Sequence, residues 1–99
     1  MASEFKVIWS DEAISNLEDI LDYLNRRWTE REVVQFKLLL AKQIEVLQNF
    51  PTLFPTSEIQ PQLRKSVLSK QTSILYLIRD ENIYLVYLFD NRMNPEKLM

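Results

Sequence analysis

Arginine, lysine and carboxylate side chains are the residues best able to do chemistry here, because neither histidine nor cysteine occurs among the 99 residues. A structural zinc site, a Ser-His or Cys-His nucleophile pair and imidazole acid–base catalysis are therefore excluded. Glycine is also absent, which argues strongly against a glycine-rich phosphate-binding loop. We expect no metal and no cofactor.

Three arginines in the C-terminal third are candidates to contact a macromolecular partner: Arg64, Arg79 and Arg92. Arg92 could bind a target, or it could pair with Asp90 or Glu96 and fix the tail. Arg64 precedes Lys65 in one expected strand, so their side chains point to opposite faces and only one can join a functional surface.

Two further groups of residues have weaker claims to a function. Tyr76 and Tyr87 could donate protons, but aromatic residues within apolar strands are more often packed. Glu18, Asp19 and Asp22 resemble a metal-binding cluster, yet their spacing places them on the exposed face of a helix. We therefore expect packing for the tyrosines and solvation for the acidic residues.

The net charge of −2 argues against direct sequence-specific DNA binding by this chain alone. Residues 1–62 hold six Lys or Arg against ten Asp or Glu, whereas residues 63–99 hold six against four. The longest apolar runs are too short to cross a bilayer, and the N-terminus lacks a signal-peptide pattern. We expect a cytoplasmic protein that does not enter membranes.

The first half of the chain predicts one strand and a helical hairpin. Residues 5–9 are apolar and rich in strand-forming residues. Ser10 is typical of a helix N-cap, and apolar residues at three- and four-residue spacings predict a helix to about Trp28. Residues 29–32, Thr-Glu-Arg-Glu, match a capping box and predict a second helix to Asn49, whose wide apolar surface we expect to pack on both the first helix and a sheet.

The second half predicts three strands: Leu63–Leu68, Ser73–Arg79 and Ile83–Asp90. Short polar turns between them favour an antiparallel meander, and the apolar last strand should be interior, beside the N-terminal strand. We predict a single α+β domain over residues 1–99, in the order β-α-α-β-β-β. It would be a four-stranded antiparallel sheet with the helical hairpin on one face and the other face free.

This pattern resembles the RelE/ParE superfamily of bacterial toxins from toxin–antitoxin pairs, also called plasmid stabilisation proteins. Three stretches carry the likeness: VIWSDEA (7–13), SILYLI (73–78) and LFDNRMNPEKL (88–98). The last is similar to an ending of many ParE-like members, a hydrophobic residue followed by D-x-R-x-x-P-x-K-hydrophobic. The likeness covers nearly the whole chain.

The resemblance implies the toxin of a type II toxin–antitoxin system, neutralised by a cognate antitoxin. RelE-like members are ribosome-dependent mRNA endoribonucleases with clustered Lys or Arg and a C-terminal Tyr or His. ParE-like members act by binding, with DNA gyrase the target of some. At the positions of the nuclease's basic residues this chain offers Arg64, Ser66, Ser73 and Arg92, and residues 91–99 hold no Tyr or His.

The ParE-like branch is therefore favoured, with no catalytic residue expected and with Arg64, Arg79 and Arg92 contacting target or antitoxin. The alternative is a ribosome-dependent endoribonuclease in which Arg64 and Arg92 stabilise the transition state. A toxin remnant without activity is a third possibility.

Overall fold

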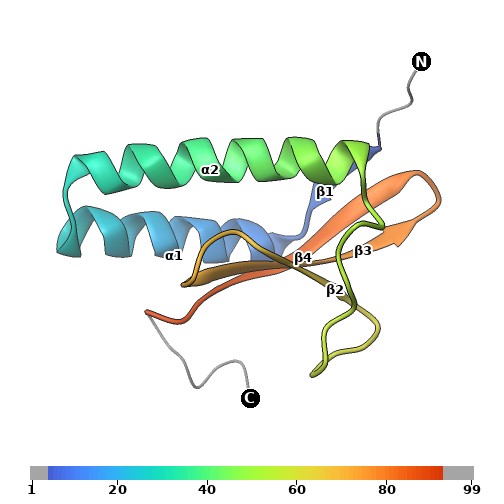
Figure 1. Cartoon of the computed structure of the whole chain (residues 1–99). Coiled ribbons are helices and arrows are strands. Elements are labelled where there is room, and N and C mark those ends of the chain that lie inside the picture. The colour runs from blue at the N-terminus through green and yellow to red at the C-terminus, as the bar shows by residue number, and fades with distance from the viewer. Residues whose placement is uncertain (1–4, 93–99) are drawn as a thin grey trace.

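Six elements follow one another in the predicted order β-α-α-β-β-β (Figure 1). The computed structural model describes residues 5–92, so the tail from Met93 onward, with Glu96 and the end of the LFDNRMNPEKL motif, lies outside the described residues. Each strand boundary lies within a residue of the sequence prediction. The elements are β1 (Lys6–Trp9), α1 (Asp11–Arg27), α2 (Glu30–Asn49), β2 (Arg64–Val67), β3 (Thr72–Arg79) and β4 (Asn82–Asp90).

Both helices begin as their sequences predict. The Ser10 hydroxyl accepts a hydrogen bond from the Ala13 N–H at 2.9 Å and donates one to the Val86 carbonyl at 2.6 Å. The cap therefore also fastens the start of α1 to β4. At the start of α2, Thr29 and Glu32 form the predicted capping box.

The sheet has the strand order β1-β4-β3-β2, so β4 is interior and lies beside β1, as predicted. The expectation of a fully antiparallel sheet is wrong for one pair, because β1 runs parallel to β4. Short turns force β2, β3 and β4 to alternate in direction. No turn links β1 to β4, so the direction of β1 need not alternate with that of β4. Its direction instead follows from α1, which begins at the end of β1 and packs back across β4.

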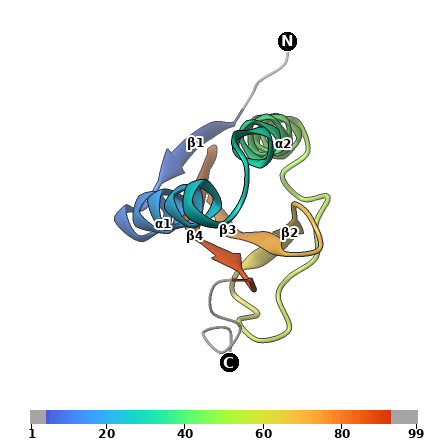
Figure 2. The ribbon, with the colours of Figure 1, turned by 90° about the vertical axis from the view of Figure 1, so that its left-hand side faces the viewer.

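Both helices lie on one side of the sheet (Figure 1), and Figure 2 shows them end-on and side by side. The predicted arrangement, with the hairpin on one face, is confirmed. The core between hairpin and sheet contains Ala13, Ile20, Leu24, Val33, Phe36, Leu40, Leu47, Ile74, Tyr76, Ile83, Leu85 and Leu88.

The second helix is less buried than its composition predicts. Leu39 is 47% exposed, Leu38 is 66% exposed, and Phe50 at the end of the helix is 61% exposed. The expectation that the whole wide apolar surface packs on α1 and the sheet is therefore wrong, because α1 occupies most of the space over β4. Part of α2 is left with apolar side chains in solvent.

Candidate functional site

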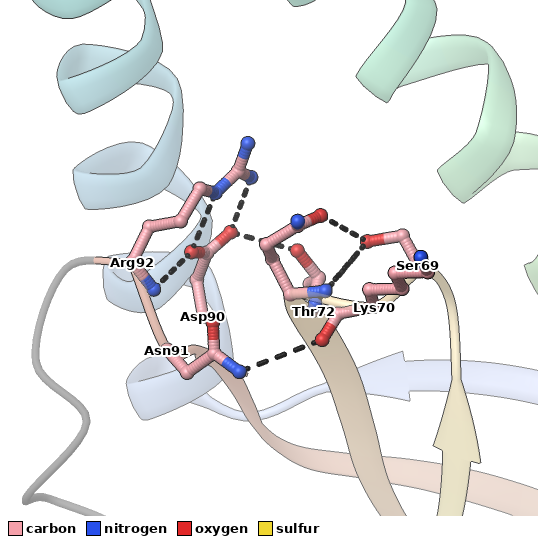
Figure 3. A network of polar contacts seen from close by, with 7 residues as sticks. Ser69, Lys70, Thr72, Asp90, Asn91 and Arg92 are labelled. Carbon is pink, nitrogen blue, oxygen red and sulfur yellow. Dashed lines mark hydrogen bonds and ion pairs between the residues drawn. The ribbon is translucent and has the colours of Figure 1, made fainter.

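The end of β4 holds Arg92 in a network of polar contacts (Figure 3). Its Nε lies 3.0 Å from Oδ1 of Asp90 and its Nη2 lies 2.6 Å from Oδ2. The backbone N–H of Arg92 also donates to Oδ1 at 3.0 Å. Such a two-pronged ion pair fixes both position and orientation. Of the two roles considered for Arg92, the pairing with Asp90 is therefore present.

Asp90 is the centre of this network, and its side chain is completely buried. It also accepts a hydrogen bond from the Thr72 hydroxyl at 2.7 Å, its cross-strand partner on β3. Burial alone would raise the pKa of Asp90, but the hydrogen bonds from Arg92 and Thr72 outweigh it and hold the pKa below its usual value. The carboxylate is thus ionised at neutral pH and neutralises Arg92.

The guanidinium of Arg92 lies under the tip of the helical hairpin. Its central carbon is 6.0 Å from the centre of the Trp28 ring, at the end of α1, and the side chain is only 22% exposed. A cation over an aromatic face is attracted by the ring's quadrupole. Arg92 therefore ties the end of β4 to the end of α1, on the helix-covered side of the sheet.

Arg64 also binds groups within the chain. Its Nη1 donates to the Phe54 carbonyl at 2.6 Å, with a longer contact of 3.5 Å to the carbonyl of Thr52. Arg64 is the cross-strand partner of Tyr76, and such partners share a face. It therefore points to the helix-covered face, and Lys65 points to the open one.

The buried Tyr76 hydroxyl donates to the Pro51 carbonyl at 2.7 Å and fastens the same loop. Burial raises the pKa of Tyr76 to about 12, so this phenol is a poor proton donor at neutral pH. Burial also raises the pKa of Tyr87. The packing role expected for Tyr76 fits its place in the core.

Arg79 is exposed at the end of the β3–β4 hairpin that lies farthest from Arg92. In the β3–β4 register Arg79 faces Asn82, whereas Asp90 faces Thr72 seven residue pairs away. At about 3.3 Å per strand residue, the two ends are roughly 25 Å apart. The structure thus does not bring Arg64, Arg79 and Arg92 together into one anion-binding site.

The open face of the sheet carries an apolar hollow that the sequence analysis did not identify. Its volume is about 480 Å³, and it lies between β2, β3 and the segment that follows α2. The only sequence signals for it are the apolar Ile59 in a polar loop and Val67 at the end of a strand, which are 56% and 57% exposed. Its other lining residues are Phe54, Pro55, Thr56, Ser57, Glu58, Lys65 and Leu75.

Residues 5–92 contain neither a cluster of metal-ligating side chains nor a helix that could span a membrane. Within that range no three His, Cys, Asp or Glu side chains gather closely enough to hold a metal ion. Glu18, Asp19 and Asp22 are all exposed on α1. No helix in the same range combines the length and the apolar character that crossing a bilayer requires.

The elements define a small α+β protein with a helical hairpin on one face of a mixed four-stranded sheet. A family described as "ParE toxin of type II toxin-antitoxin system, parDE" matches residues 7–95. The chain belongs to this family, within the RelE/ParE superfamily, as its sequence motifs predicted. Comparison with curated protein sequences gives no match.

Solved structures with the same fold include several toxins. A chain of the chromosomal ParDE system of P. aeruginosa has a TM-score of 0.73 at 17% identity, covering 88% of this chain and 96% of that one. HP0894 of Helicobacter pylori has a TM-score of 0.58 at 11% identity, covering 89% and 96%. The E. coli DinJ–YafQ toxin–antitoxin complex gives 0.55 at 10% identity, covering 93% and 98%. At these identities the likeness concerns the fold.

Proposed function

We propose that this toxin is held inactive by a cognate antitoxin and, once released, acts by binding a protein target such as DNA gyrase. The observation that carries the proposal is the use of Arg64 and Arg92 inside the fold. Arg64 donates to a loop carbonyl, and Arg92 is paired with a buried carboxylate. Both guanidinium groups thus already hold partners within the fold, and the charge of Arg92 is neutralised by Asp90, which disfavours their use on an RNA phosphate.

Proton transfer presents a second difficulty for the nuclease alternative. RNA cleavage by a 2′-hydroxyl needs groups that remove one proton and supply another. The chain has no histidine, and the phenol of Tyr76 is buried with a raised pKa. A mechanism of binding needs no such groups, and it therefore fits the available side chains better.

The antitoxin's place in this proposal is the open face of the sheet. The hollow there is lined mainly by apolar side chains, together with Thr56, Ser57, Glu58 and Lys65. An extended or helical segment laid across β2 would bury Val67 and Ile59, which are otherwise exposed to water. The matching chains from the ParDE and DinJ–YafQ systems make a protein partner of this kind a natural expectation.

The mode of action is tested with the purified chain in two reactions. One is cell-free bacterial translation with analysis of mRNA ends, and the other is DNA gyrase acting on plasmid DNA. We expect intact mRNA together with inhibited supercoiling or trapped DNA breaks. Arg26→Ala, which changes an exposed arginine on α1, serves as a control for loss of charge.

Codon-positioned mRNA cuts that vanish in Arg92→Ala would overturn the proposal and establish the nuclease. Because Arg92→Ala leaves Asp90 without its partner, circular dichroism must first show that the variant is folded, and Arg92→Lys provides a second variant that keeps a cation. Normal growth on induced expression of the wild-type chain would instead identify an inactive remnant. The antitoxin surface is tested separately by Val67→Asp, which we expect to weaken capture by the antitoxin roughly tenfold or more.

A further inference from the structure

The outer side of α2 carries a row of residues that the core and the open face do not use. Arg31, Val34, Leu38, Ala41 and Glu45 follow each other at alternating spacings of three and four residues. This is the spacing of a coiled-coil seam. Val34 is 49% exposed and Leu38 is 66% exposed, the largest exposure among the large apolar residues of the described chain.

This seam faces away from the rest of the molecule. The side of α2 that packs in the core is formed by Val33, Phe36, Leu40 and Leu47. On a helix with 3.6 residues per turn, those positions lie opposite to Arg31, Leu38 and Glu45. Figure 1 accordingly shows α2 along the outside of the hairpin, with no helix or strand over its outer side.

The charges at the two ends of the seam are of opposite sign. Arg31 lies seven residues before Leu38 and Glu45 lies seven residues after it, which is about 10 Å along the helix in each direction. Both side chains are exposed, and neither is in an ion pair within residues 5–92. The seam is therefore positive at one end, apolar in the middle and negative at the other.

We propose that a second copy of this chain binds here, with the two α2 helices antiparallel and crossing at Leu38. A twofold axis through Leu38 brings Arg31 of each copy opposite Glu45 of the other, so the surface is complementary to itself. In this register the remaining charged residues beside the seam do not meet a like charge. Glu30 lies opposite Val46 of the other copy, Lys37 opposite Leu39, and Lys42 opposite Val34.

The alternative orientation is disfavoured by the same charges. Two parallel α2 helices in register would set Arg31 against Arg31 and Glu45 against Glu45, and such like charges repel. Charge therefore selects the antiparallel pair. A single apolar stripe buries less than a standard protein interface, so we expect a dimer with a dissociation constant on the order of 10–100 µM.

The dimer is tested by sedimentation velocity of the full-length chain without its antitoxin, from about 1 to 300 µM, which brackets that constant. We expect a shift from one to two chain masses with rising concentration. Leu38→Asp should remain a monomer throughout this range. Because Leu38 is exposed, this substitution should leave the circular dichroism and the unfolding midpoint unchanged.

Charge exchange tests the antiparallel register. Glu45→Arg alone and Arg31→Glu alone should each weaken the dimer roughly tenfold, because each removes two symmetric ion pairs and adds repulsion. The double variant Arg31→Glu/Glu45→Arg should restore wild-type association, since the pairs re-form with reversed signs. Glu18→Arg makes the same charge change on the exposed face of α1 and should have no effect.

A wild-type chain that stays monomeric at every concentration would overturn the proposal and leave the seam to the antitoxin or target. A dimer that is insensitive to Leu38→Asp would overturn it as well, since the contact would then lie elsewhere. Failure of the double variant to recover association would exclude the antiparallel pairing. None of these results depends on the toxin's mode of action.

Discussion

Asp90 is a fully buried carboxylate that binds both a neighbouring strand and the residue two positions after it. Its oxygens accept hydrogen bonds from Thr72 on β3 and from Arg92 beyond the end of β4. An ionised group without partners at this depth would be strongly destabilising. Here the partners keep the carboxylate ionised. Through them Asp90 connects β3, the turn after β4 and, by way of Arg92, Trp28 at the end of α1.

We expect Asp90→Asn to lower the free energy of unfolding at pH 7 by about 2–3 kcal/mol, because Arg92 and Thr72 lose a charged acceptor. Folding lowers the pKa of Asp90, so the wild-type carboxylate contributes its full stability above its unfolded pKa of about 4. That contribution is lost as the pH falls through the lower folded pKa. Urea unfolding of both proteins at several pH values between about 2 and 7 measures the difference in their free energies of unfolding. We expect this difference to become smaller as the pH falls.

Asp22→Asn is the matched control for this measurement. Asp22 pairs with Arg26 at 3.5 Å, but their side chains are 69% and 72% exposed. Solvent screens such a pair, and we expect a change below about 0.5 kcal/mol at either pH. An equal loss for Asp90→Asn at pH 7 and at low pH would contradict the proposed role of its charge.

The β3–β4 turn shows how an element forms in a chain that has no glycine. Asp80 has a φ of 59°, in the left-handed region that glycine adopts most easily. Aspartate tolerates this region better than most residues because its short side chain can bond locally. Asp80 thus takes the place that glycine usually holds in such a turn.

Asp80→Gly should therefore raise the free energy of unfolding by about 0.5 kcal/mol, since relief of the strained backbone exceeds the added freedom of the unfolded chain. Glu81→Gly, at the neighbouring turn position without a positive φ, should lower it by about 0.5–1 kcal/mol. Chemical denaturation of the two variants gives both values. Stabilisation by Glu81→Gly, or destabilisation by Asp80→Gly, would contradict the assignment of strain to Asp80.

At the scale of the whole molecule, the interior strand β4 and the edge strand β2 are held very differently. β4 lies between β1 and β3 and is covered by α1, and the Ser10 hydroxyl binds its Val86 carbonyl. β2 is bonded to β3 on one side and to the segment around Pro55 on the other. Its contact with α2 includes the hydrogen bond from the Gln43 amide to the Ser66 hydroxyl.

We expect amide hydrogen exchange to divide the sheet accordingly. The N–H groups shared by β3 and β4 should exchange slowest, through global unfolding. The N–H of Lys65, which donates to Pro55, and that of Ser57, which donates to Leu63, should exchange at least about tenfold faster through local opening. NMR exchange rates measured amide by amide test this, and equal protection of Lys65 and the β4 amides would contradict it.

Several properties of the candidate site were accessible from sequence and others were not. The pairing of Arg92 with Asp90 was one of two expectations, because residues two apart at a strand end can meet. The partner of Arg64 is a backbone carbonyl of Phe54, and a carbonyl acceptor has no sequence signature. The seam on α2 was not recognised because Val34 and Leu38 alternate with apolar residues of the buried side, and only packing shows which of them remain exposed.

By itself, the sequence determined the order of the elements, the caps of both helices and the family, because these depend on residues close together in the chain. The tertiary structure alone decided the parallel direction of β1, the face on which each arginine lies and which apolar residues of α2 remain in water. Those properties depend on contacts between distant residues, such as Ser10 with Val86 or Gln43 with Ser66. Local spacing limits where a side chain can point, but packing decides what it meets there.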